Sequence, residues 1–435
     1  MAASASQVFA QTSTTPATSA AVDTGDTAWL LTSTALVLLM TPGLAFFYGG
    51  LVRRKNALAT IMQSFIIIGL ISVQWVLWGY SLAFAPDAFG GLIGRLDWVG
   101  LRGVGLEPNS DYGPTVPHQA YMIFQMMFAV ITPALITGAF AERIRFKAFI
   151  FFTLLWATFV YDPIAHWVWS GTGGPAGIWK AMGALDFAGG TVVHASSGVS
   201  ALVAAIYLGK RIGFGQERLE PHDATMVVLG ASLLWFGWFG FNAGSAIASG
   251  ALATSAFVAT HVATAMAAIT WMTMSWMHKG APSVLGAAAG AVAGLVAITP
   301  ASGYVTPMGG LLIGFGAGVI CYWAVVWTKD RFGVDDALDV FGVHGVGGTF
   351  GALATGLLAT TTINAAGGNG LFYGNPQQLL TQFITVAATW IWAAVVTFII
   401  LKIVDTIIGL RVEEHEELAG LDASMHGEPA YAVEI

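Results

Sequence analysis

The sequence predicts an all-α polytopic membrane protein with eleven transmembrane helices. Of its 435 residues, 56% are hydrophobic and only 9% are charged, whereas soluble globular domains carry about 25% charged residues. The apolar residues form long unbroken runs, which are typical of membrane-spanning helices and not of the short alternating strands of a β-barrel. This composition excludes a soluble enzyme, a nucleic-acid-binding protein and a disordered scaffold.

The eleven spans follow from the length of these runs, because about 20 apolar residues cross a hydrocarbon core. The predicted spans are residues 28–48, 58–84, 118–140, 147–168, 190–209, 224–242, 253–277, 283–298, 304–327, 340–360 and 377–408, of which the eighth is short. Residues 27–408 then form the membrane domain, and 409–435 form a cytoplasmic tail. Residues 1–26 are a polar leader or the remnant of a signal peptide.

The basic residues support this count and give the orientation. Of the 17 Lys and Arg residues, all but Arg95, Arg102 and Lys180 fall in the odd-numbered connections or at the C-terminal end. Basic residues concentrate on the cytoplasmic side of a membrane protein. We therefore expect the N-terminus outside the cell, the C-terminus in the cytoplasm, and a location in the cell (inner) membrane.

A repeated spacing suggests that the membrane domain contains two inverted five-helix repeats followed by a final long helix. Asp186 precedes His194 by eight residues at the start of the fifth span, and Asp336 precedes His344 by eight residues at the start of the tenth. The fifth span starts outside and the tenth starts inside, as an inverted repeat requires.

Apart from His118 at the first position of the third span, four histidines lie within the predicted spans, where ionisable groups are costly and point to function. Small residues flank His194 and His344, so the helices that carry them can approach closely and bring the two imidazoles together. The alternative is two unrelated histidines bonded to backbone carbonyls. His166 and His261 are interpreted as helix-packing residues. No span holds a His-x3-His or a Glu-x-x-His pair, and we expect neither a metal nor a cofactor.

Several residues near the outer ends of the spans could either bind a cation or have only a structural role. Asp186 is suited to cap the helix that follows it, and its charge would also favour an approaching cation. Trp169 and the segment from Phe241 to Ser245 could form a cation–π cup for a small cation. The alternative for such rings is an ordinary interfacial anchor.

Seven ordered segments together resemble the ammonium transporter family (Amt/MEP/Rh), and specifically its bacterial Amt type. They are FYGGLVRRKN (47–56), GAFAERIRF (138–146), PIAHWVW (163–169), LDFAGGTVVH (185–194), WFGFNAGSA (238–246), GLVAITPASGYV (294–305) and DVFGVHGVGG (339–348). The resemblance extends from about Trp29 to Tyr431. One departure is the segment 170–185, which is longer than usual and contains Gly-Thr-Gly-Gly-Pro.

The resemblance implies site residues. An outer recruitment site for ammonium would comprise Trp169, Ser245, Phe128 and Asp186, a pore gate would comprise Phe128, Phe241 and Phe124, and His194 and His344 would be the twin histidines that line the pore and relay a proton. Asp186 would act structurally and electrostatically. The family fold implies a homotrimer in which every protomer has its own pore.

The tail segment GLDASMHGEPAY (420–431) resembles the regulatory motif of bacterial members, with Gly420, Leu421, Asp422, His426, Gly427 and Glu428 as its matching residues. In the family this tail packs under the pores and communicates with a PII-type signalling protein. The alternative is an acidic disordered end, because seven acidic residues and one arginine follow Leu410.

The resemblance implies ammonium transport, with methylammonium as a further substrate, and our own hypothesis is that the uptake is electrogenic. Ammonium would be deprotonated at the outer site, and ammonia would pass through the apolar pore. The alternatives are an electroneutral ammonia or gas channel and an ammonium sensor. We expect no enzyme activity, because the sequence shows no catalytic or nucleotide-binding motif, and no nucleic-acid partner.

Overall fold

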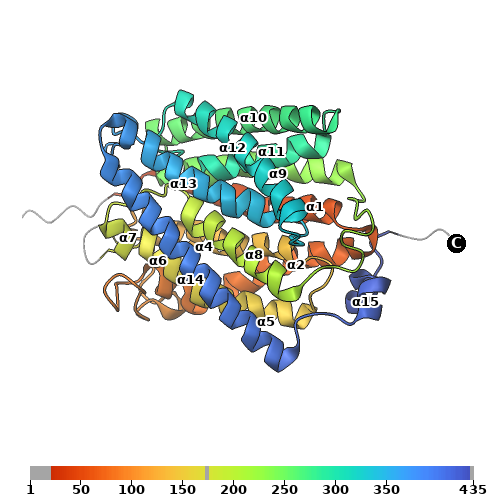
Figure 1. Ribbon diagram of the computed structural model, residues 1–435. Coiled ribbons are helices and arrows are strands. Elements are labelled where there is room, and N and C mark those ends of the chain that lie inside the picture. The colour runs from red at the N-terminus through yellow and green to blue at the C-terminus, as the bar shows by residue number, and fades with distance from the viewer. Residues whose placement is uncertain (1–20, 172–175, 432–435) are drawn as a thin grey trace, which may run out of the picture.

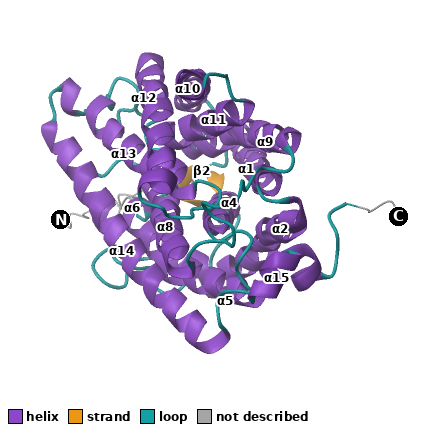
Figure 2. Cartoon of the chain, turned by 45° about the vertical axis from the view of Figure 1, so that its right-hand side comes forward, coloured by secondary structure: helices purple, strands orange, loops and turns teal. Residues whose placement is uncertain are grey.

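The structure is a computed structural model that describes residues 21–171 and 176–431. These residues form a bundle of helices (Figure 1), with a single short hairpin of β1 (Pro108–Asn109) and β2 (Gly113–Pro117) among them (Figure 2). The segment 1–26, predicted to be a leader, lies mostly outside the described residues. The same holds for part of the long segment 170–185.

Ten helical segments of the described chain are long and apolar enough to cross a membrane. They are α1 (Thr24–Leu51); η1 (Arg54–Asn56), α2 (Ala57–Gln74), η2 (Trp75–Gly79) and α3 (Tyr80–Phe84); α4 (His118–Ile136) with η4 (Thr137–Ala139); α5 (Phe146–Trp156), η5 (Ala157–Tyr161) and α6 (Asp162–Trp169); η6 (Gly190–Ala195) and α8 (Ser196–Leu208); α9 (Ala224–Ala243) with η7 (Gly244–Ala246); α10 (Ala251–Lys279); α12 (Pro307–Val326) with η8 (Trp327–Arg331); η9 (Phe341–Gly345) with α13 (Val346–Leu358); and α14 (Pro376–Ile408). The apolar helix α11 (Val284–Ile298) is shorter, as expected for the eighth span. This architecture confirms the predicted all-α, multi-pass fold.

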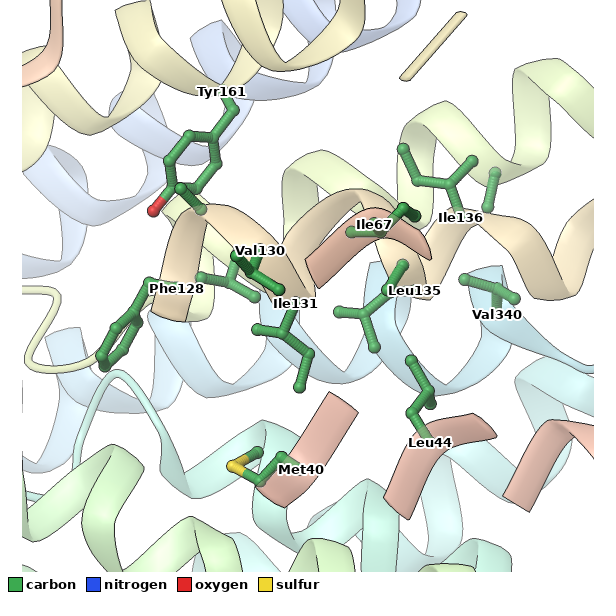
Figure 3. Packing of buried hydrophobic residues seen from close by; sticks show 14 of the residues in the cluster. Met40, Leu44, Ile67, Phe128, Val130, Ile131, Leu135, Ile136, Tyr161 and Val340 are labelled. Atoms are coloured by element: carbon green, nitrogen blue, oxygen red, sulfur yellow. The ribbon is translucent and has the colours of Figure 1, made fainter. Parts of the chain in front are cut away.

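The helix α4 lies at the centre of the bundle, with 94% of its apolar window buried inside the protein. Figure 3 shows Ile131 and Leu135 of α4 beside Met40 and Leu44 of α1, within one apolar core. A helix that is apolar on all sides is stable only when other helices or lipid surround it. Its central position makes α4 a common wall for the features described below.

Glycine allows α1 and α9 to pack closely. A Cβ atom at Gly230 of α9 would lie 2.2 Å from the backbone nitrogen of Phe47 in α1, closer than any side chain can approach. Small residues at such positions let helix backbones meet in a membrane, where burial of apolar surface does not by itself drive association.

The bundle has two different ends. The loop end carries residues 85–117, the hairpin and α7 (Ile178–Ala181), whereas the tail end carries residues 409–431. Figure 1 shows α7 and α15 (Glu414–Ala419) on opposite sides of the bundle. The tail is ordered through α15 and η11 (Asp422–His426), so the reading of an acidic disordered end is wrong for the described residues.

The two histidines interpreted as packing residues have different surroundings. His166 is buried and bonds the carbonyl of Ala83 at 3.0 Å and a carboxylate oxygen of Asp87 at 3.2 Å, which confirms its packing role. His261 is exposed in the single chain, but its ring packs on α9, with centroids 5.5 Å from Trp235 and 6.1 Å from Phe239, which agrees with a packing role. Its exposure follows from the helical period, because α10 buries the alanines at 259, 263 and 267 on another face.

Candidate functional site

A cavity of about 800 Å³ opens at the loop end. Its walls include all four residues expected at the recruitment site, Trp169, Ser245, Phe128 and Asp186, which come from four different helical segments or their ends. Further wall residues are Asp111, Tyr112, Tyr121, Lys180 and Tyr304. Aromatic rings, carboxylates and a hydroxyl around an open cavity are suited to a small cation.

The Asp186 carboxylate is held by the start of the next helix. It accepts four backbone N–H bonds, from Gly189 and Gly190 at one oxygen and from Thr191 and Val192 at the other, at 2.7–3.1 Å. This bonding confirms the capping interpretation. Burial raises the pKa of Asp186, and the four bonds act against that rise.

Trp169 is fixed through the same residue. Its indole nitrogen donates to the backbone carbonyl of Asp186 at 2.9 Å, which turns the ring toward the floor of the cavity. The edge of Phe128 meets the Trp169 ring at right angles, with centroids 5.8 Å apart. The hydroxyl of Ser245 donates to the Phe241 carbonyl at 2.8 Å, and its oxygen keeps lone pairs that can accept from a ligand.

Two stacked rings close the floor of this cavity. Phe128 of α4 and Phe241 of α9 have centroids 4.2 Å apart and planes inclined by 29°. Phe124, one helical turn before Phe128, packs against it edge to face at 5.0 Å. All three rings are buried, so the structure brings together the residues expected at the gate.

His194 and His344 lie on the far side of these rings. Their Nδ1 atoms are 3.3 Å apart, their ring centroids are 5.3 Å apart, and both side chains are buried. The His194 ring also stacks on Trp238 at 5.3 Å and on Phe241 at 6.0 Å. The predicted contact between the two imidazoles is therefore present, and the reading of two unrelated histidines is wrong.

The backbone around each histidine is built alike. Each stands in a π-helical turn, η6 or η9, at the start of its span. The residue five positions before each histidine has a positive φ, 113° at Gly189 and 64° at Asp339. Asp336 accepts the N–H of Phe341 at 2.7 Å, whereas Asp186 accepts four such bonds. The shared spacing thus reflects a shared local structure.

An apolar void and a second cavity continue the line of the first cavity. The void holds only about 10 Å³ and is bounded by Phe241, both histidines and apolar residues of α1 and α4. A cavity of about 280 Å³ follows, in which His344 forms part of the wall and Asp339 and Lys279 lie toward the tail end. The cavities, the ring pair and the histidines therefore succeed one another through the bundle.

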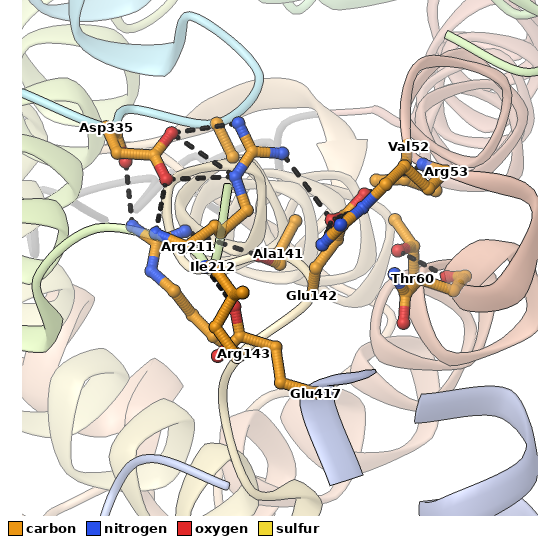
Figure 4. Close-up of polar contacts among 12 residues, drawn as sticks. Val52, Arg53, Thr60, Ala141, Glu142, Arg143, Arg211, Ile212, Asp335 and Glu417 are labelled. Atoms are coloured by element: carbon orange, nitrogen blue, oxygen red, sulfur yellow. Dashed lines mark hydrogen bonds and ion pairs between the residues drawn. The ribbon is translucent and has the colours of Figure 1, made fainter. Parts of the chain in front are cut away.

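A buried ionic network at the tail end was not predicted. Figure 4 shows Glu142, whose backbone has a positive φ of 71°, bonded to Arg53, with Arg211 3.7 Å away. The Arg211 guanidinium also donates two hydrogen bonds to the Asp335 carboxylate, at 2.8 and 2.9 Å. Arg143 donates to the backbone carbonyl of Asp335 at 2.7 Å. Burial lowers the pKa of Arg143 to about 10. The clue in the sequence is the charged pair in the segment 138–146, which interrupts an apolar run.

The tail docks on this network and on the start of α2. Asp422 accepts the N–H groups of Leu58 and Ala59 at 3.1 and 2.8 Å, so it caps a helix far away in the chain. The N–H of Leu421 bonds Asn56 at 2.8 Å. A Cβ at Gly420 would lie 2.6 Å from Lys55, so only glycine fits there.

The remaining tail residues complete a compact turn. The ring of His426 meets Phe146 edge to face at 5.0 Å, Gly427 has a positive φ of 68°, and the N–H of Glu428 bonds the Asp422 carbonyl at 3.2 Å. Before them, Glu417 is buried and accepts from the Ile212 N–H and from Arg411. The tail thus holds three separate connections between spans at their ends.

Comparisons with known proteins agree with this arrangement. The sequence profile of the Ammonium Transporter Family matches residues 28–431. The chain is 52% identical to the ammonium transporter of Bacillus subtilis over 94% of this chain and 98% of that protein, and 47% identical to ammonium transporter Amt1 of Archaeoglobus fulgidus over 94% and 99%. Its fold matches the crystal structure of Saccharomyces cerevisiae Mep2 with a TM-score of 0.85 at 36% identity, over 91% of this chain and 89% of the other. The chain is a member of the ammonium transporter family.

Proposed function

We propose that this member of the family takes up ammonium by binding the cation at the loop end, removing one proton and passing ammonia through the bundle. The observation that carries the proposal is the succession of features along one line. The cavity with Trp169 and Asp186 comes first, the stacked Phe128 and Phe241 come next, and the pair of His194 and His344 follows.

Recruitment is supported by the chemistry of the first cavity. The faces of Trp169 and Phe128 attract a cation, and the Ser245 oxygen can accept one of its N–H bonds. The Asp186 carboxylate is engaged by backbone N–H groups, so its part is to shape the site and to add negative charge.

Selectivity follows from what lies beyond the rings. A void of about 10 Å³ with apolar walls cannot hold a hydrated ion, and an unpaired charge is very costly there. Ammonium can give up a proton and continue as neutral ammonia, whereas potassium of similar size cannot. The proton then crosses separately, through the histidine pair and water, which makes the uptake electrogenic.

The loop end then faces the outside and the tail end faces the cytoplasm of a cell (inner) membrane. This orientation is supported by the scarcity of basic residues in the loop-end connections. From the family we infer eleven spans in two inverted repeats, a homotrimer, and a tail that is regulated by binding of a PII-type signalling protein. The Asp422 cap on α2 supports the last inference, because a partner that displaced the tail would release that helix end.

A transient-current measurement tests the proposal. The protein in proteoliposomes receives a jump of ammonium or of potassium, and His194→Ala is compared with His415→Ala, an exposed histidine of the tail. We expect a current with ammonium only, reduced or made unselective by His194→Ala and unchanged by His415→Ala.

Other outcomes identify the alternatives. Ammonia flux without current would indicate a neutral channel. Ammonium binding without flux would indicate a sensor.

A further inference from the structure

Lys180 places a positive charge inside the cavity that is proposed to receive ammonium. It belongs to the short helix α7 at the loop end and lines the same cavity as Trp169 and Asp186. The connections of the loop end contain two other basic residues, Arg95 and Arg102, and both side chains are exposed and bond loop carbonyls instead.

The Lys180 ammonium is bonded to the recruitment site itself. Nζ donates to the backbone carbonyl of Trp169 at 3.0 Å, and the Trp169 indole in turn donates to the carbonyl of Asp186 at 2.9 Å. A lysine head group is chemically a substituted ammonium ion, with the same charge and the same N–H donors as the proposed substrate. It therefore satisfies an acceptor next to the proposed site, and its charge repels a second cation in the cavity.

Lys180 loses its proton at a lower pH than an exposed lysine does. Burial lowers the pKa of its ammonium to about 8, and the nearby Asp111 carboxylate acts against this change. The other titratable groups around it are Asp186, Tyr112, Tyr121 and Tyr304 in the cavity wall and His166 in α6, the helix that α7 packs against. Burial raises the pKa of the Tyr112 and Tyr304 phenols, so these two stay neutral when Lys180 titrates.

We infer that Lys180 acts as a built-in competing cation, which weakens ammonium binding at the outer cavity while it is protonated and releases the site when it loses its proton. This inference deepens the proposed function and rests on recruitment at this cavity. Two unit charges several ångströms apart in a partly hydrated site change affinity by about threefold to tenfold. Binding of ammonium should therefore tighten as the pH rises through the range in which Lys180 titrates.

Ligand-induced thermal stabilisation of the purified, full-length protein measures binding without requiring transport. The midpoint concentration of ammonium chloride is determined at about pH 6.5 and about pH 9, on either side of the Lys180 pKa of about 8, at equal concentrations of the ammonium cation and with potassium chloride as the salt control. Lys180→Gln removes the charge and keeps a donor, Lys180→Met removes both, and Lys180→Arg keeps the charge at both pH values. Arg102→Gln removes a charge at the same end but outside the cavity.

We expect the wild-type midpoint to fall about threefold or more from the lower to the higher pH. Lys180→Gln should bind tightly at both pH values, and Lys180→Arg should bind weakly at both. Lys180→Met should follow Lys180→Gln, so either neutral variant suffices if the other does not fold. Arg102→Gln should behave as the wild type.

Weaker binding in both neutral variants would overturn the inference, because it would mean that Lys180 only supports the position of Trp169. A wild-type pH dependence in Lys180→Arg would also overturn it, since another group would then be titrating. The inference would also be overturned if ammonium chloride stabilised the protein no more than potassium chloride does. The current measurement is independent: the expected binding pattern without any ammonium current would refute the proposed transport and leave the role of Lys180 in binding intact.

Discussion

His194 and His344 face each other through their Nδ1 atoms, 3.3 Å apart, and this contact couples their protonation. One ring must carry its proton on Nδ1 and the other must accept there, so two fully protonated rings cannot share the bond. In the neutral pair, one ring presents an unprotonated Nε2 and the other presents an Nε2–H. A proton taken up at one end can therefore leave at the other when the shared proton shifts.

The first prediction concerns His194→Asn. The asparagine amide can occupy the position of Nδ1, so the contact with His344 is kept while the Nε2 acceptor is lost. We expect the ammonium current in proteoliposomes to fall at least about tenfold with the thermal stability nearly unchanged. Ser197→Ala is the control, because that hydroxyl only bonds the His194 carbonyl at 3.3 Å. A full current in His194→Asn would show that the proton takes another route.

Phe128→Ala is expected to open the gate. The change removes the ring that stacks on Phe241 at 4.2 Å and joins the large cavity to the void beside the histidines. We expect potassium current to appear, together with a stability loss of about 3–5 kcal/mol. Phe140→Ala is the matched control, since Phe140 is equally buried but packs on Phe149 and Phe152.

The control variant separates gating from general loosening of the fold. Phe140→Ala should lose similar stability and remain impermeable to potassium. If both variants conduct potassium, the leak comes from damage to the bundle and Phe128 has no special part in the gate.

Asp186→Ala is expected to destabilise the protein strongly. It leaves four buried N–H groups at the start of η6 without acceptors, at a cost of about 3 kcal/mol or more. Asp186→Asn keeps one acceptor oxygen, so we expect about half of that loss. Thermal unfolding in detergent measures both. Asp336 accepts the Phe341 N–H, so we expect Asp336→Ala to lose less stability than Asp186→Ala. Equal losses of stability in the two variants would contradict the capping argument.

The spans and the histidine pair could be predicted from the sequence because both depend on local patterns. Apolar runs fix the length of a helix, and a shared eight-residue spacing places His194 and His344 at equivalent points of two helices. The docked tail and the partners of Arg211 depend on which helix ends meet in space. No periodicity in the chain encodes such contacts.

The ring pair proposed as a gate could not be found from composition either. The chain has 27 phenylalanines, and composition cannot distinguish Phe128 and Phe241 from the rest. Only the resemblance to a family selected them, and only the packing of α4 against the other helices shows that they stack. Lys180 was counted as one of three basic residues on its side of the membrane, and its place in the cavity wall had no signal in the sequence.

The pair of Asp335 and Arg211 is expected to make the stability of the protein depend on pH. Burial alone would raise the pKa of Asp335, but the bonds from Arg211 at 2.8–2.9 Å and its charge lower it overall. A carboxyl whose pKa is lower in the folded state stabilises the protein above its unfolded pKa of about 3.9, and this contribution is lost as the pH falls through the folded value. Thermal unfolding temperatures of the wild type should therefore drop more steeply below about pH 5 than those of Asp335→Asn, whereas Asp97→Asn, at an exposed carboxylate, should follow the wild type. Identical acid profiles for all three proteins would mean that this ion pair does not control acid stability.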